Sequence, residues 1–162
     1  MSAPLFSSCS LDDLESSSRD KYGHTSDRIL EKVFYSQQPI FEELIVMFDD
    51  DSKIERISFD TNYLVDDPNR PAADIGFTEA RWNQYRNIFS KLKLKGGISR
   101  HVERHSIHLI ASVISYLIGG SGKGYVYSKI PLKPLLSSLD NIQVNQISYK
   151  KLMKENWYLF LD

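Results

Sequence analysis

The sequence predicts an α+β fold in which an antiparallel sheet packs against helices. A helical period spans residues 78–94, β-rich runs with short Gly-rich turns follow it, and no crossover helix separates those runs. Parallel strands need such crossovers, whereas antiparallel strands are joined by tight turns. We therefore expect an antiparallel sheet of about five to six strands packed against one main helix, 78–94, and a short N-terminal helix.

The short helix is predicted to begin near residue 26. Ser26 or Asp27 can cap it, and Gln37–Pro39 would end it because proline disrupts a helix interior. Its apolar face would consist of Ile29, Leu30, Val33 and Phe34.

A first hairpin is predicted after this helix. The apolar run 44–48 is typical of a buried strand, the acidic stretch 49–52 is typical of a turn, and 54–59 would return as the second strand. The stretch 66–71 contains two prolines and an asparagine and is typical of a loop.

The main helix has the clearest pattern. Thr78 precedes it, Lys91 complements the negative end of its dipole, and Gly96–Gly97 would supply a left-handed exit. Large apolar side chains recur in it at spacings of 3, 4 and 3, so they share one face. These side chains are Trp82, Tyr85, Phe89 and Leu92.

The second half of the chain is rich in strand signals. The β-branched run 107–118, the glycine turn 119–122 and the run 125–127 predict a second hairpin. We also expect a helical turn at 135–139, a short strand at 146–149 and a terminal strand at 157–161.

The composition is that of a soluble globular protein. Of 162 residues, 41% are apolar and 12% aromatic, which is enough for one core and too much for a disordered chain. The longest apolar run, 107–118, has 12 residues, whereas a helix that crosses a bilayer needs about 20. We expect one domain, 26–162, after a polar, Ser-rich tether at 1–25.

The net charge of −1 conceals an asymmetry. Residues 1–77 carry 7 Lys and Arg against 16 Asp and Glu, a charge of −9, and residues 78–162 carry 13 against 5, a charge of +8. The two parts either neutralise each other in the fold, which we favour, or present opposite faces that steer a charged partner.

Two motifs of nucleotide chemistry are incomplete. In Gly119–Gly124, Lys123 suggests a phosphate loop, but the first glycine of that pattern would fall on Leu117, so a hairpin loop is expected. Lys123, Tyr125 and Tyr127 match the start of an RNA-binding strand pattern, but the later positions do not match, so we expect alternating aromatic side chains on a half-buried strand. They are the contact set of our alternative function, a nucleic-acid-binding protein or an enzyme that uses the basic C-terminal half.

Three histidines, His101, His105 and His108, flank Glu103 at spacings that differ from the zinc-binding H-E-x-x-H pattern. We expect them on a strand edge or turn without a metal.

The residue types of a nucleophilic triad occur together in His24, Ser26 and Asp27, yet neighbours in sequence rarely reach catalytic geometry, and capping explains the last two. The acidic run 49–51 lacks the other ligands and the glycine of a calcium loop. We predict no catalytic residue, cofactor or metal.

The single cysteine, Cys9, excludes an intramolecular disulfide. The run Leu5–Cys9 resembles the lipobox of bacterial lipoproteins, in which the cysteine is lipidated, although no basic start and apolar stretch precede it. The resemblance implies a lipid anchor on Cys9, and Ser10 after it implies retention at the outer membrane. The other interpretation is an ordinary cysteine in a polar terminus of a cytoplasmic protein.

The second half also resembles a group of small bacterial envelope proteins of unassigned function, many of which carry a lipobox. The likeness covers roughly 27–162 and rests on the segments 107–115, 122–128, 131–135, 137–140 and 156–160. It implies no catalytic residues, and its lipidated cysteine corresponds only to Cys9.

We therefore expect a non-enzymatic envelope lipoprotein domain that binds another protein, as an immunity protein binds a toxin, with the lipid as its only membrane contact. Nucleic acid is not the expected partner. The basic cluster Lys91, Lys95, Arg100 and Arg104 supplies further candidate binding residues.

Overall fold

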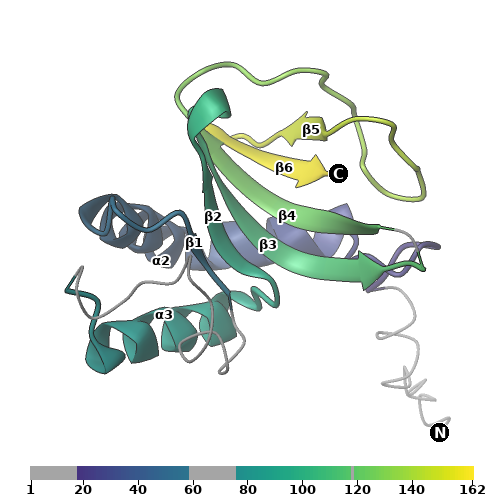
Figure 1. The fold of residues 1–162 in the computed structure, drawn as a ribbon. Coiled ribbons are helices and arrows are strands. Elements are labelled where there is room, and N and C mark those ends of the chain that lie inside the picture. Colours follow the sequence, from purple (N-terminus) through teal and green to yellow (C-terminus); the bar gives the residue numbers. More distant parts are fainter. Residues whose placement is uncertain (1–17, 59–75, 118) are drawn as a thin grey trace, which may run out of the picture.

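Six antiparallel strands form one open sheet, and two helices lie against one of its faces (Figure 1). The computed structural model describes residues 18–58, 76–117 and 119–162. The strand order is β1-β2-β3-β4-β6-β5. The predicted α+β class is confirmed. In chain order the elements are α2 (Asp27–Asp50), β1 (Arg56–Ile57), α3 (Glu79–Leu92), β2 (Gly97–His101), the 3-10 helix η3 (Val102–Arg104), β3 (Ser106–Ser115), β4 (Gly120–Ser128), β5 (Ser148–Lys151) and β6 (Trp157–Leu161).

The main helix is α2, with 24 residues, rather than the predicted helix at 78–94, which forms α3 with 14. The predicted end at Gln37–Pro39 is wrong, because α2 kinks at Gln37, where φ is −124° and ψ is 19°, and then continues. Pro39 removes one backbone N–H and its ring crowds the preceding turn, and a helix tolerates both by kinking.

The predicted strand 44–48 and the first hairpin are also wrong. These residues lie in the second half of α2, where Leu44 and Phe48 are fully buried and Val46 is 63% exposed. A strand would place all three side chains on one face, whereas a helix turns Val46 away from the other two. A short apolar run without a clear period is compatible with either structure, so the sequence pattern could not decide. The short β1 pairs with β2 instead.

Helix α3 begins as predicted, because the Thr78 side chain accepts a hydrogen bond from the Arg81 N–H at 3.1 Å. Its four predicted apolar side chains are buried. The left-handed residue after the helix is Lys93, with φ 56°, rather than the predicted glycine pair. Gly97 has φ 80°. Its lack of a side chain allows β2 to pair closely with β1, since a Cβ there would lie 2.0 Å from the carbonyl oxygen of Ile57 in β1.

The predicted second hairpin is confirmed as β3 and β4. The predicted glycine turn at 119–122 and hairpin loop at 119–124 are wrong, because β3 ends at Ser115 and β4 begins at Gly120, so Gly120–Gly124 pair with β3 as strand residues.

A β-bulge shifts the register of this hairpin between Ile110 and Ser112. Gly124 faces this bulge, where a Cβ would lie 2.1 Å from the carbonyl oxygen of Leu109. The glycine therefore allows the two strands to approach closely at the bulge.

The C-terminal segment follows the prediction in part. Strand β6 has the predicted bounds, and β5 begins at Ser148 rather than at 146. The predicted helical turn at 135–139 is wrong, because Leu135 forms a parallel bridge with Tyr149 at the outer edge of β5.

The core fills the space between the helices and one face of the sheet. Its centre is an aromatic cluster of Phe34, Phe41, Tyr125 and Trp157. A smaller cluster that includes Leu132 and Val126 covers part of the opposite face, where the segment between β4 and β5 crosses (Figure 1). Among the described residues, no helix has the length and apolarity needed to cross a bilayer.

Residues 18–25 pack against the domain, although the predicted tether 1–25 includes them. The Ser26 N–H donates to the Ser18 carbonyl at 2.9 Å, and the Lys21 N–H donates to Asn141 Oδ1 at 2.8 Å. Cys9 and the predicted loop at 66–71 lie outside the described residues.

Candidate functional site

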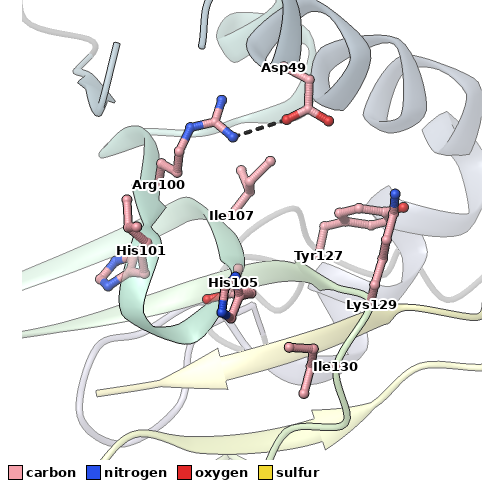
Figure 2. A pocket seen from close by; sticks show the side chains of 10 residues that line it. Asp49, Arg100, His101, His105, Ile107, Tyr127, Lys129 and Ile130 are labelled. Atoms are coloured by element: carbon pink, nitrogen blue, oxygen red, sulfur yellow. Dashed lines mark hydrogen bonds and ion pairs between the residues drawn. The ribbon is translucent and has the colours of Figure 1, made fainter. Parts of the chain in front are cut away.

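A cavity of about 450 Å³ opens at the end of the sheet where η3 connects β2 to β3. Figure 2 shows its side chains converging from the end of α2, the β2–η3 turn and the end of β4. We call it the η3 pocket. Its volume lies within the range of protein ligand sites. It is lined by Asp49, Arg100, His101, Val102, His105, Ser106, Ile107, Tyr127, Lys129 and Ile130.

Arg100 belongs to β2, and its guanidinium contacts the C-terminus of α2. Its Nη1 donates to Asp49 Oδ1 at 3.0 Å and its Nη2 donates to the carbonyl oxygen of Phe48 at 2.7 Å (Figure 2). The guanidinium also lies 4.6 Å from the centroid of the Phe48 ring. The Arg100 Nε is buried and has no hydrogen-bond partner. The C-terminal end of a helix favours a cation, so α2 helps to hold Arg100 at the pocket wall.

Two histidines are packed together beside the pocket. The rings of His101 and His108 are 4.1 Å apart, and His108 Nε2 lies 3.1 Å from the hydroxyl of buried Ser106. Burial above all, followed by the electrostatic influence of His101 and Arg104, lowers the pKa of His108 to about 3. Burial, followed by the charge of Arg104, also lowers the pKa of His101. His108 is therefore a poor proton acceptor for Ser106 at neutral pH, which argues against a nucleophile and base here.

Two side chains at the mouth of the pocket have no polar partner within the described residues. Lys129 and His105 are exposed, and neither side chain makes a hydrogen bond or ion pair within the described residues. Ile107, Tyr127 and Ile130 supply apolar wall. The unpaired charge of Lys129 next to this apolar wall could bind a carboxylate that is attached to an apolar group.

The contact set predicted for nucleic acid does not form a surface. Lys123 and Tyr125 are 0% and 1% exposed, and Tyr125 donates a hydrogen bond from its hydroxyl to the carbonyl oxygen of Leu30 in α2. Tyr127 is half-buried, packs against Trp157 with ring centroids 5.3 Å apart, and also lines the η3 pocket. These side chains alternate along β4 onto the face that the helices cover, so they are core residues.

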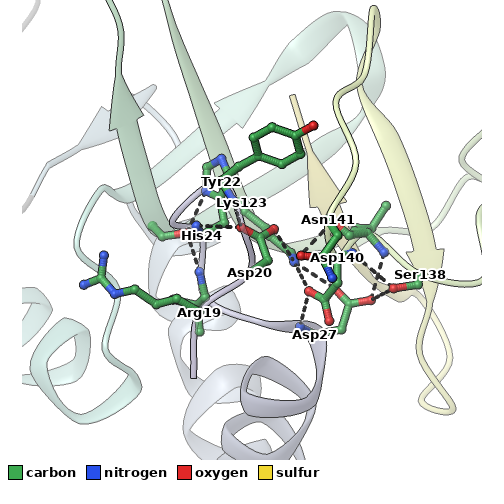
Figure 3. Close-up of polar contacts among 12 residues, drawn as sticks. Arg19, Asp20, Tyr22, His24, Asp27, Lys123, Ser138, Asp140 and Asn141 are labelled. Atoms are coloured by element: carbon green, nitrogen blue, oxygen red, sulfur yellow. Dashed lines mark hydrogen bonds and ion pairs between the residues drawn. The ribbon is translucent and has the colours of Figure 1, made fainter. Parts of the chain in front are cut away.

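Lys123 is the centre of a buried ionic cluster (Figure 3). Its Nζ lies 2.9 Å from Asp27, 2.6 Å from Asp140 and 3.9 Å from Asp20. Burial on its own would raise the pKa of Asp27, but the hydrogen bond from the Leu139 N–H and the charge of Lys123 lower it overall. The cluster joins the N-terminal segment, α2 and the segment after β4.

The two oppositely charged parts of the sequence neutralise each other through such pairs. Seven ion pairs between described residues join an acid before Phe77 to a base after it, whereas the pair of Lys123 with Asp140 lies within the second part. The pairs are Asp20 and Asp27 with Lys123, Asp27 and Glu31 with Lys150, Glu42 with Lys154, Asp49 with Arg100, and Asp51 with Arg81. The acidic run 49–51 is therefore not a free hairpin tip.

His24 forms a hydrogen-bonded chain rather than a catalytic triad. Its Nδ1 lies 3.0 Å from Ser112 Oγ and its Nε2 lies 2.9 Å from Ser121 Oγ. Because the Ser121 hydroxyl donates to the backbone oxygen of Asp162 at 2.6 Å, Nε2 is the donor to Ser121. Burial lowers the pKa of His24 and keeps the ring neutral. The nitrogen that faces Ser121 thus carries a proton and cannot accept the serine's.

The other two residues of that grouping have separate roles. Ser26 occupies the N-cap position of α2, but its side chain makes no capping hydrogen bond. Asp27 pairs with Lys123 through one carboxylate oxygen and with Lys150 through the other.

The three histidines considered for a metal do not converge. His101 ends β2, His108 lies within β3, and His105 occupies the turn between them in a left-handed conformation. Within the described residues, no cluster of three or more His, Cys, Asp or Glu side chains could hold a metal ion.

The predicted basic cluster is divided by β2. Arg100 and Arg104 lie at the η3 end, where Arg104 Nη1 donates to the Tyr149 hydroxyl at 3.2 Å. Lys91 and Lys95 lie before the start of β2, at its other end. The four side chains therefore belong to two separate surfaces.

Sequence reasoning missed Lys129 as a pocket residue. The sequence pattern could have identified it, because side chains two residues apart in a strand share a face, and Lys129 follows Tyr125 and Tyr127 at that spacing. The contribution of Asp49 could not be foreseen, because the turn predicted at 49–52 is the end of a long helix.

Comparison of the chain with protein-family models, with curated proteins and with solved structures finds no match.

Proposed function

We propose that this protein is a non-enzymatic, protein-binding domain of the bacterial cell envelope, and that an acidic segment of its partner binds in the η3 pocket. One observation supports the binding site: Lys129 and His105 are unengaged at the mouth of a cavity whose only lining carboxylate, Asp49, already pairs with Arg100. The site therefore has the unpaired positive charge of Lys129 and little negative charge that would repel a carboxylate.

The proposed role is immunity-like, in which the domain neutralises one partner protein by covering part of its surface. Exposed Val102 and Ile130 at the pocket mouth, 63% and 48% exposed, supply apolar contact area beside the charges. Interfaces gain affinity from such buried apolar groups and specificity from the surrounding charges.

The alternative function loses support, since it depends on Lys123, Tyr125 and Tyr127 as surface contacts. Two of these side chains are fully buried and the third is half-buried.

The binding proposal is tested by capture from an extract of the source cell. A photo-crosslinking amino acid at Val102 should link one protein, and mass spectrometry should place the crosslink in an acidic segment of it. Lys129→Glu should abolish the crosslink, whereas the matched charge reversal Lys95→Glu, at the other end of β2, should leave it intact. Equal crosslinking by both variants, or no crosslinked protein, would refute the site.

The proposed anchor is a lipid on Cys9, and its support is the resemblance of Leu5–Cys9 to a lipobox. Growth of cells that produce the full gene product in radiolabelled palmitate should label the protein. The label should disappear in Cys9→Ala. A label that persists in this variant, or an unlabelled parent protein, would contradict the anchor.

A further inference from the structure

A second group of unengaged basic side chains lies at the opposite end of β2 from the η3 pocket. Arg19, Lys91, Lys93 and Lys95, which we call the tether patch, are all exposed. None of them has a carboxylate partner within the described residues, and the guanidinium of Arg19 donates only to the carbonyl oxygen of Gly23. The ion pairs that neutralise the two parts of the sequence leave this patch positive.

The fold places the residues of the tether patch, which come from separate segments, next to one another. Arg19, Lys93 and Lys95 line one cavity of about 200 Å³, and Lys91 lies in the last turn of α3 just before it. Ser18, the first described residue, lines the same cavity. The described part of the chain therefore begins at the patch, nine residues after Cys9.

The length of the segment from Cys9 to Ser18 limits how far the patch can lie from the bilayer. Cys9 precedes Ser18 by nine residues, and nine extended residues span at most roughly 30 Å. Lipid headgroups that bear negative charge attract exposed lysines and arginines near the surface. A lipid chain and a basic patch together also bind a membrane more stably than a single lipid chain alone.

We propose that the tether patch contacts the anionic headgroups of the membrane that holds Cys9, so that the lipid is not the only membrane contact as the sequence led us to expect, an inference that rests on the proposed lipid anchor. The contact orients the domain. Lys95 lies just before the start of β2 and Arg100 near its end, so a patch that faces the bilayer turns the η3 pocket away from it. The proposed partner site is then accessible in the surrounding compartment.

The test uses the full chain with Cys9→Ala, so that no lipid contributes. The chain is sedimented with vesicles of phosphatidylglycerol and phosphatidylcholine in equal parts, and with vesicles of phosphatidylcholine alone. We expect sedimentation with the anionic vesicles at about 0.05 M salt and release at about 0.5 M, because salt screens such charges. No sedimentation with anionic vesicles at low salt, or equal sedimentation with neutral ones, overturns the proposal.

Matched variants separate this patch from general positive charge. Replacing Lys91, Lys93 and Lys95 by Gln should lower the partition coefficient at least about tenfold, since each surface lysine contributes about fivefold. The control replaces Lys53, Lys129 and Lys133 by Gln, which are exposed lysines outside the patch. Far-UV circular dichroism checks that both variants are folded. An equal loss in the two variants overturns the proposal.

Two further measurements distinguish a headgroup contact from a general polyanion site and from the lipid anchor. Soluble polyglutamate should not displace the protein from anionic vesicles at equal charge concentration, and full displacement would make the patch a general polyanion site instead. The palmitate experiment on Cys9 tests the anchor alone. A failure of labelling leaves the vesicle result unchanged, so the two proposals can fail separately.

Discussion

The ammonium group of Lys123 lies 2.9 Å from Oδ1 of Asp27, and both side chains are buried. Lys123 is in β4 and Asp27 begins α2, so this pair fixes the first turn of the long helix to the centre of the sheet. Asp20 and Asp140 complete the ionic cluster around the same nitrogen (Figure 3). The carboxylates are tolerated inside the protein because Lys123 is there.

Removal of Lys123 should therefore destabilise the protein strongly. We expect Lys123→Met to lower the free energy of unfolding by about 3–5 kcal/mol, because it leaves buried Asp20 without its counter-charge and buried Asp27 with Lys150 alone. Urea denaturation followed by circular dichroism measures this. Lys129→Met, at an exposed lysine, is the control and should change stability by less than about 0.5 kcal/mol. A loss for Lys123→Met as small as that of the control would show that the cluster is solvated.

Acid should destabilise the protein through His108. The pKa of this residue is lowered from 6.5 to about 3 in the fold, mainly by burial. The unfolded chain thus binds the proton first, so the contribution of neutral His108 to stability is present above pH 6.5 and is lost as the pH falls towards 3. NMR of the imidazole should show no protonation of His108 at pH 5. Urea midpoints should fall across the same interval, and less steeply in His108→Gln. A ring that titrates near pH 6.5 would contradict the burial argument.

The helical assignment of 44–48 is open to a direct mutational test. Leu44→Ala should cost about 2–5 kcal/mol and Phe48→Ala about 3–5 kcal/mol, because both side chains are in the core. Val46→Ala should cost less than about 1 kcal/mol, since this side chain is exposed. If 44–48 were a strand, Val46 would share the face of the other two residues. A loss at Val46 comparable to theirs would then support the strand.

Binding at the η3 pocket should depend on salt. Once the partner is identified by crosslinking, its Kd should rise as ionic strength increases, because the charges at the pocket mouth are exposed and screened. Lys129→Glu should weaken binding by at least tenfold, about 1.4 kcal/mol, and leave the thermal midpoint within about 2 °C of the parent. Isothermal titration calorimetry provides the Kd. An affinity that is indifferent to both salt and this substitution would place the contact elsewhere.

Local patterns predicted the elements whose residues carry a clear period or turn signal. Helix α3 has large side chains at helical spacing after a capping threonine, and the β3–β4 hairpin joins a β-branched run to an aromatic one through glycines. Strand β6 also has its predicted bounds at 157–161. In each of these elements the local preference and the tertiary packing agree.

The candidate site was less predictable, because its residues come from separate segments. Arg100 was a candidate from the sequence, but its partners Asp49 and Phe48 were assigned to a hairpin that does not exist. Lys123 was a contact residue only of the alternative, nucleic-acid-binding function, because glycines and tyrosines surround it in the sequence. Nothing local indicates that Asp20, Asp27 and Asp140 meet around it.

By itself the sequence determined the α+β class, the second hairpin and the opposite charges of its two parts, since periodicity, glycine-rich segments and residue counts are local properties. Only the tertiary structure decided that 44–48 is helical, that Lys123 is internal and that the basic residues divide between the η3 pocket and the tether patch. The physical reason is that an apolar run or a charged side chain takes its structure from what packs against it. For Lys123 those neighbours are carboxylates from distant segments, whose charges make its burial possible.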